Sequence, residues 1–199
     1  MGGLRIIIIF ESVILILHIV FMKRFLYGIL FVLPALMAIV SFVPARRNSA
    51  KPEGTLYIII DKSDFELRVY DDEGWYATYP VVFGSKDAGD KMFEGDKKTP
   101  NGNYKIILKK IHPKWSNELL LDYPTKENIE RFNKRKQEGL IPAKAKIGAG
   151  IAIHATRPEE EWTIDKFYNW TDGCVSLKYS EMKDLYEYIP VGTQVTIQP

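Results

Sequence analysis

The chain has 199 residues, of which 46% are apolar and 13% aromatic, a composition that supports a folded core and excludes a disordered chain. Its formal net charge is +2, but residues 1–50 hold five bases and one acid, which leaves 22 bases against 24 acids, a net of −2, over residues 51–199. No basic stripe therefore remains that would indicate nucleic-acid binding.

An uncharged apolar run occupies residues 25–43 and follows Lys23 and Arg24. It is about as long as the hydrocarbon core of a bilayer is thick, with bases on one flank, so it predicts a signal sequence or a signal anchor. A second apolar run at 6–22 could be another span. Only two residues separate the two runs, too few for an ordinary helical hairpin, so we expect a single export segment.

This export segment divides the chain into two parts. We expect a leader and linker over 1–50, with Met22 as a natural start and 1–21 as an over-long beginning, followed by one catalytic domain over 51–199. The domain is then exported, either periplasmic or in the cell envelope, and membrane-anchored if the leader is not cleaved. Membrane contact is expected only through the N-terminal segment.

The exported part opens with three β-rich runs, at 55–61, 65–70 and 75–84, separated by turn-sized polar stretches. They predict an antiparallel meander, in which Pro80 favours an edge or a bulge. The elements expected after it are a charged loop at 85–98, a strand at 103–110, a helix at 126–138 capped by Thr125 and ended by Gly139, a strand at 149–155, a helix at 180–188 capped by Ser180, and a strand at 193–197.

The single cysteine, Cys174, lies in the segment Trp-Thr-Asp-Gly-Cys and cannot form a disulfide within the chain. A small buried hydrophobe is the common role of such a residue, but Cys174 follows a polar, glycine-containing turn, which favours a nucleophile. A thiol nucleophile needs a base. His18 lies in the leader and His112 beside Pro113 suggests an exposed strand end, so His154, at the end of a buried strand, is the candidate base.

His154, sixteen intervening residues and the segment Thr171-Asp172-Gly173-Cys174-Val175 resemble the signature of the L,D-transpeptidase family with a YkuD-type catalytic domain. The segment Gly-Asp-Lys-Lys-Thr-Pro-Asn-Gly-Asn-Tyr at 95–104 resembles a second motif of that family, in the same order along the chain. The resemblance covers 55–198. It implies a mainly β, sandwich-type catalytic domain with a few α-helices, needing no cofactor and no metal.

The resemblance also implies a reaction. Cys174 attacks the carbonyl between an L-centre and a D-centre of a peptidoglycan stem peptide and forms a thioester, while His154 takes the thiol proton and returns it to the leaving amine. Gly173 would let the backbone N–H of Cys174, alone or with its own N–H, reach the developing oxyanion. Thr171 would brace the loop.

Two positions depart from the usual family pattern. Asp172 replaces a second histidine and Ser176 replaces Arg or Asn, which resembles the YafK-like branch, where amide cleavage is an attributed outcome besides transfer. The acyl group could therefore go to another stem, to a lipoprotein amine or to water. Asp172 itself is equally a solvated loop residue or a functional one.

Weaker candidates surround these residues. Arg157 could bind a stem carboxylate, and Trp170 could contact substrate, while the aromatic residues at 162–170 could form a lid or pack in the core. Two other classes of protein stay open. One is a zinc peptidase with His154, Asp172 and Cys174 as ligands, and the other is a wall-binding module without catalysis.

Overall fold

The structure is a computed structural model that describes residues 45–46, 51–114 and 116–199, so the predicted leader lies outside the described residues. None of the helices in this part has the length and apolar character needed to cross a membrane. The elements are β1 (Ala45–Arg46), β2 (Tyr57–Asp61), β3 (Glu66–Asp71), β4 (Gly74–Pro80), β5 (Gly102–His112), β6 (Ser116–Leu121), α2 (Lys126–Gln137), β7 (Ala152–Ala155), a 3₁₀ turn (Pro158–Glu160), α3 (Trp162–Asp165), β8 (Val175–Leu177), α4 (Tyr179–Tyr188) and β9 (Gln194–Gln198).

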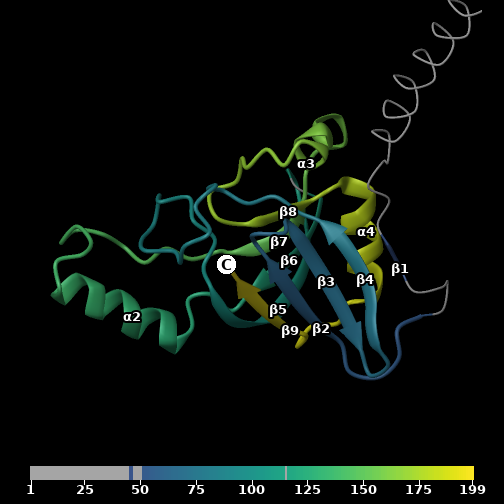
Figure 1. The fold of residues 1–199 in the computed structure, drawn as a ribbon, viewed down its shortest axis with the longest axis horizontal. Coiled ribbons are helices and arrows are strands. Elements are labelled where there is room, and N and C mark those ends of the chain that lie inside the picture. Colours follow the sequence, from purple (N-terminus) through teal and green to yellow (C-terminus); the bar gives the residue numbers. More distant parts are fainter. Residues whose placement is uncertain (1–44, 47–50, 115) are drawn as a thin grey trace, which may run out of the picture. The chain divides into compact units, whose positions relative to one another are not determined.

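The strands form one hydrogen-bonded sheet in the order β1-β4-β3-β2-β9-β5-β6-β7-β8 (Figure 1). The predicted meander is confirmed, since β2, β3 and β4 pair antiparallel in sequence order. The long strand β5 joins the two halves, because its first residues pair with β9 and its last with β6. A register shift between Ile106 and Leu108 lies within the pairing with β6, close to the point where the pairing with β9 ends. The last pair, β7 and β8, is parallel.

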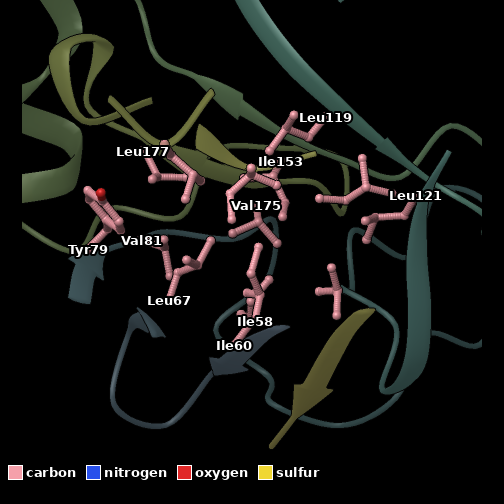
Figure 2. Close-up of a cluster of buried hydrophobic side chains, with 14 of the residues drawn as sticks. Ile58, Ile60, Leu67, Tyr79, Val81, Leu119, Leu121, Ile153, Val175 and Leu177 are labelled. Carbon is pink, nitrogen blue, oxygen red and sulfur yellow. The ribbon is translucent and has the colours of Figure 1, made fainter. Parts of the chain in front are cut away.

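The core lies between the two halves of this sheet, one formed by β1, β4, β3, β2 and β9 and the other by β5, β6, β7 and β8. Ile58 and Ile60 of β2 and Leu67 of β3 are fully buried in one cluster with Ile153 of β7 and Val175 of β8. Figure 2 shows these side chains meeting from opposite sides. The expectation of a mainly β, sandwich-type domain is therefore confirmed, and the two layers belong to one continuous sheet.

Helix α2 begins and ends close to its predicted bounds. Thr125 is its N-cap, with its side-chain oxygen accepting from Asn128 N–H. The prediction for α4 is wrong at its start, because Ser180 lies inside the helix. The N-cap is Lys178, the residue before the helix, and its backbone N–H donates to the Glu181 carboxylate. Sequence patterns did not identify β6, β8 or α3, which are too short or too irregular to show a period.

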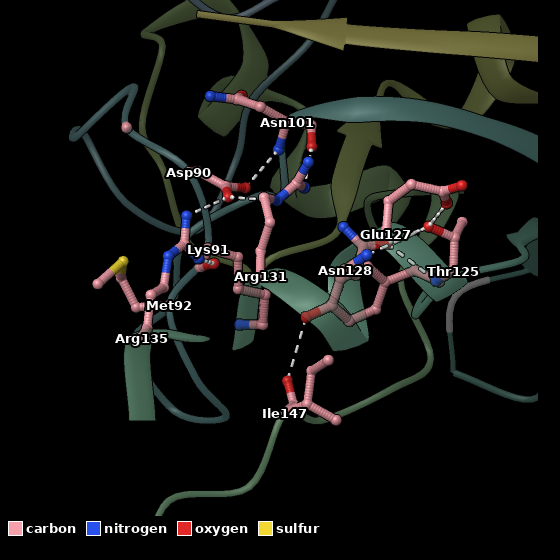
Figure 3. A network of polar contacts seen from close by, with 12 residues as sticks. Asp90, Lys91, Met92, Asn101, Thr125, Glu127, Asn128, Arg131, Arg135 and Ile147 are labelled. Atoms are coloured by element: carbon pink, nitrogen blue, oxygen red, sulfur yellow. Dashed lines mark hydrogen bonds and ion pairs between the residues drawn. The ribbon is translucent and has the colours of Figure 1, made fainter. Parts of the chain in front are cut away.

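Helix α2 holds the glycine-rich loop that runs from 85 to 101. Arg135 donates to the Asp90 carboxylate at 2.7 Å and to the Lys91 carbonyl at 2.8 Å, and Arg131 donates to the Asn101 carbonyl at 3.0 Å (Figure 3). Asp90 also accepts from the backbone N–H of Asn101 at 2.9 Å. Charge-assisted hydrogen bonds of this kind fix a loop that has no regular secondary structure of its own.

Candidate active site

One face of the β5–β8 half carries a row of polar residues. Side chains alternate along a strand, so Ile153 enters the core and His154 points to the other face. The register places His154 opposite Glu118 of β6 and opposite Ser176 of β8, and it places Glu118 opposite Lys110 of β5. We call these four residues, Lys110, Glu118, His154 and Ser176, the polar row.

Cys174 joins this face from the start of β8. It precedes Val175, which pairs with Ile153, so it shares a face with Ser176 and lies beside Ala152. Cys174 and His154 line the same pocket of about 260 Å³, whose other lining residues are Lys110, His112, Glu118, Leu120, Gly150 and Ala152. The fold thus brings together the two residues that the sequence separates by twenty positions.

His154 is held in one orientation by its neighbours. It is 4% exposed, and its Nδ1 lies 2.9 Å from the carbonyl oxygen of Ala155. A carbonyl only accepts, so Nδ1 carries the proton and Nε2 is the basic nitrogen. The indole of Trp170 packs edge-on against the imidazole, with ring centroids 5.6 Å apart. Burial lowers the pKa of His154, although the Ala155 hydrogen bond and the negative charge of Glu118 act to raise it. The lowered pKa keeps the imidazole neutral near pH 7.

Cys174 is a thiol in this environment. Loss of solvation raises its pKa to about 11, the Ala152 backbone hydrogen bond opposes this rise, and the negative charges of Glu118 and Asp172 add to it. Its Sγ lies 3.6 Å from the Gly150 carbonyl oxygen. A neutral thiol beside a neutral imidazole must transfer its proton as it attacks, so the pair has the character of a nucleophile with a general base.

The loop before Cys174 is braced by Thr171. The Thr171 hydroxyl donates to the Cys174 carbonyl at 2.8 Å and accepts from the Gly173 N–H at 3.2 Å. The Gly173 N–H therefore has a partner within the loop, and its expected role toward an oxyanion, together with the Cys174 N–H, stays a prediction. Gly173 has a φ of 124°, and a Cβ there would lie 2.7 Å from the Lys98 carbonyl oxygen.

A buried ion pair lies behind this loop. Lys91 Nζ and Asp96 Oδ1 are 2.8 Å apart, and both side chains are almost fully buried. Burial acts to raise the pKa of Asp96, but hydrogen bonds from Lys91 and from the backbone N–H groups of Met92, Lys98 and Phe93 hold it below its usual value. The motif at 95–104 therefore supports the cysteine loop through packing.

Comparison with known proteins agrees with this geometry. The family described as YkuD, L,D-transpeptidase catalytic domain, matches residues 55–197. The chain belongs to this family. It is 30% identical over 148 residues, 72% of each chain, to the Bacillus subtilis (strain 168) protein named "Putative L,D-transpeptidase YqjB".

Solved structures show a similar fold. The helical cell shape determining protein Pgp2 from Campylobacter jejuni is 25% identical, with a TM-score of 0.53 over 72% of this chain and 47% of that one. Its K307A mutant, 22% identical, gives a TM-score of 0.54 over 74% of this chain and 48% of that one. The match thus covers about half the length of the Pgp2 chain in both structures. The resemblance inferred from the sequence motifs is confirmed at the level of the family.

Other predicted site residues lie outside the pocket of this YkuD domain. Arg157 pairs with Glu160 at 3.0 Å and lines a separate pocket with Lys114 and Tyr179. Asp172 is exposed, and it acts on Cys174 through its charge. The aromatic residues at 162–168 do not line the Cys174 pocket, and Phe167 packs edge-on against Phe65 instead.

The zinc alternative finds no support in the geometry. Within residues 45–46, 51–114 and 116–199, no group of three or more His, Cys, Asp or Glu side chains is placed to hold a metal ion. Of its three supposed ligands, Cys174 and His154 line the pocket, whereas Asp172 does not.

Three titratable residues of the pocket, Lys110, His112 and Glu118, were missed from the sequence. His112 ends β5, as expected, but it is partly buried instead of exposed, and it lines the pocket together with Lys110 and Glu118. Alternation between Lys110 and His112 was a signal that they share a face. Nothing in the sequence showed that this face carries Cys174.

Proposed function

We propose that this chain is a cysteine-dependent L,D-transpeptidase that acts on peptidoglycan stem peptides through a thioester on Cys174. The observation that supports this most directly is the shared pocket of Cys174 and His154, with the imidazole oriented by the Ala155 carbonyl. Membership of the YkuD family supports the reaction class. The names of the two relatives, "Putative L,D-transpeptidase YqjB" and the cell shape determining protein Pgp2, support a cell-wall substrate.

The reaction begins with proton transfer. The Cys174 thiol gives its proton to Nε2 of His154 while sulfur bonds to the carbonyl carbon at the L-centre, and the Cys174 N–H donates to the oxyanion. The C–N bond then breaks, and His154 returns the proton to the departing amine, which leaves a thioester. An acceptor amine attacks this thioester, its proton passes to His154, and the thiol is restored as the acyl group leaves.

The raised pKa of Cys174 has a functional consequence. An unassisted thiol with a pKa of about 11 is almost entirely protonated at neutral pH. The nucleophile is therefore generated only where His154 can take the proton during attack, which limits side reactions of the only thiol in the chain.

The acceptor decides between transfer and hydrolysis. An amine of a second stem gives a cross-link, an amine of a lipoprotein attaches that protein to the wall, and water gives an amidase or carboxypeptidase. The Thr-Asp-Gly-Cys loop of the YafK-like type keeps cleavage as the alternative function. A wall-binding module without catalysis is the third possibility.

One experiment separates these functions. The full chain is incubated with muropeptides and the products are identified by mass spectrometry, with Cys174→Ala and His154→Ala as matched controls. Cross-linked dimers support transfer, and shortened monomers support hydrolysis. We expect an acyl-enzyme mass on Cys174 and no product from Cys174→Ala. An unchanged mixture with the wild-type chain would contradict both enzymatic functions.

We also infer that the domain is exported and remains near the membrane. The uncharged run at 25–43 behind Lys23 and Arg24 supports a signal sequence or anchor, and a wall substrate requires a position outside the cytoplasm. Fractionation of cells expressing the full chain, with N-terminal sequencing of the mature protein, tests both export and cleavage.

A further inference from the structure

The pocket holds a charged pair that the cysteine and histidine chemistry does not use. Lys110 Nζ lies 3.0 Å from Glu118 Oε1, and both residues line the pocket with Cys174. The two side chains differ in exposure, 40% for Lys110 and 8% for Glu118. The carboxylate is therefore the buried member, and the ammonium is the member that solvent or a substrate can reach.

This arrangement prepares the ammonium for a second acceptor. An ammonium has three N–H donors, of which the contact with Glu118 uses one. Glu118 fixes the position of a side chain that would otherwise be mobile, so less entropy is lost when a ligand binds. The remaining donors suit an anionic oxygen, because charge-assisted hydrogen bonds are the strong ones.

The sheet sets the distance from this cation to the nucleophile. Glu118 lies on β6 and Cys174 at the start of β8, two strands away. Neighbouring strands are about 4.8 Å apart and a strand rises about 3.3 Å per residue. Glu118 is level with Ser176, two residues along β8 from Cys174. The cation held by Glu118 therefore lies about 12 Å from the carbonyl that Cys174 attacks. The carboxylate of the departing residue cannot reach so far, since standard bond lengths keep it within about 4 Å of that carbonyl.

We propose that Lys110, held by Glu118, is a specificity-determining residue that binds a carboxylate at the end of the side chain of the residue whose carbonyl is attacked. This inference rests on the proposed function for the identity of the substrate. An extended side chain with three methylene groups places its terminal carboxylate about 8 Å from the attacked carbonyl, and a hydrogen bond of about 3 Å to the Lys110 ammonium covers most of the remaining distance. The substrate main chain then occupies the Cys174 end of the pocket.

Binding to an inactive protein tests this selectivity without turnover. The full-length Cys174→Ala chain is titrated calorimetrically with a stem tetrapeptide containing diaminopimelate, and with the same peptide in which the side-chain carboxylate is a carboxamide. We expect the free carboxylate to bind about tenfold more tightly, the size of one charge-assisted hydrogen bond at a partly exposed site. A third peptide, with the neighbouring residue amidated instead, should bind like the first.

Three variants in the Cys174→Ala background identify the residue responsible. Lys110→Gln should remove the preference for the carboxylate, Lys110→Arg should retain it, and Lys105→Gln, at an exposed lysine of the same strand, should leave it unchanged. If Lys110 only neutralised Glu118, Lys110→Gln would weaken both peptides equally, and that result would overturn the proposal. Equal binding of the first two peptides would also overturn it.

Turnover is measured separately with the wild-type chain. If the wild-type chain consumes neither peptide but the Cys174→Ala chain still prefers the carboxylate, the proposed reaction fails and the Lys110 site stands. If both peptides react at the same kcat/KM and bind equally, the reaction stands and the Lys110 site fails.

Discussion

Two lysine–carboxylate pairs flank the cysteine of this domain, and they differ in their access to solvent. Lys91 and Asp96 meet at 2.8 Å behind the cysteine loop, with 4% and 6% of their side chains exposed. Lys110 and Glu118 meet at 3.0 Å inside the pocket, with 40% and 8% exposed. The distances are nearly equal, so distance alone does not separate a structural pair from one that can bind a ligand.

The difference lies in what the remaining donors do. Lys91 Nζ also donates to the Lys98 carbonyl at 3.4 Å, and three backbone N–H groups complete the shell of Asp96. We call Lys91–Asp96 the closed pair. It fixes the backbone of Lys98, against which Gly173 packs. Lys110 keeps an accessible ammonium, so its pair can exchange solvent for a ligand. Burial of the cation, more than the presence of a partner, decides which pair is structural.

The largest effect should follow from removing the cation of the buried pair Lys91–Asp96. Lys91→Met leaves the Asp96 carboxylate buried without its cation, which should lower the free energy of unfolding by about 3–5 kcal/mol. Urea denaturation measures the loss, with Lys105→Met as the exposed control, which should change it by less than about 0.5 kcal/mol. Equal midpoints for the two variants would contradict the structural role of the closed pair.

A smaller loss of unfolding free energy is expected at Gly173, where the cysteine loop packs against the segment that contains Lys91 and Asp96. Gly173→Ala combines a positive φ with a Cβ only 2.7 Å from the Lys98 carbonyl oxygen, so it should cost more than about 2 kcal/mol of stability. Gly192→Ala is the matched control, because Gly192 also has a positive φ, of 96°, but nothing within 4 Å of the added Cβ. Similar losses in thermal denaturation would show that the close contact is unimportant.

Removing the cation of the accessible pair Lys110–Glu118 should lower the free energy of unfolding by less. Lys110→Gln leaves Glu118 beside a pocket that solvent can enter, so the loss of unfolding free energy should stay near or below about 1 kcal/mol. The same urea experiment used for Lys91→Met measures it. A loss as large as that of Lys91→Met would remove the distinction between the two pairs.

The smallest effect concerns the pKa of the thiol. Glu118 and Asp172 both raise the pKa of Cys174, with Glu118 the stronger, because a nearby negative charge disfavours the thiolate, whereas Lys91 acts to lower it. Glu118→Gln should therefore shift the pH midpoint of Cys174 alkylation by iodoacetamide below that of the wild-type chain, and Asp172→Asn should shift it less in the same direction. Cys174→Ala gives the labelling background. A midpoint that moves to higher pH in Glu118→Gln would refute this electrostatic assignment.

The candidate catalytic pair shows how far sequence reasoning reaches. The sequence predicts Cys174 as nucleophile and His154 as base from a lone thiol, its polar turn and a strand-end histidine, and the fold places the two residues in one pocket. The Ala155 carbonyl, which orients the imidazole, comes from the residue next to His154. Neighbouring residues within a motif constrain one another locally, so their chemistry can be read from short segments.

The rest of the pocket could not be predicted in this way. Tyr104 and Ile106 of β5 face the core, and strict alternation would send Lys110 to the same side. The register shift between Ile106 and Leu108 reverses this pattern, so Lys109 pairs with Leu119 on the core side and Lys110 faces the pocket.

By itself, then, the sequence determined the β-rich meander, the family and the two candidate catalytic residues, because each depends on local patterns or short motifs. Only the tertiary structure decided that Lys110 and Glu118 line the same pocket as Cys174 and His154. A single irregularity in β5 and the pairing of β5 through β8 bring Lys110, Glu118, His154 and Ser176 into one row. Strand register is a property of several distant segments packing together, and no one segment carries it.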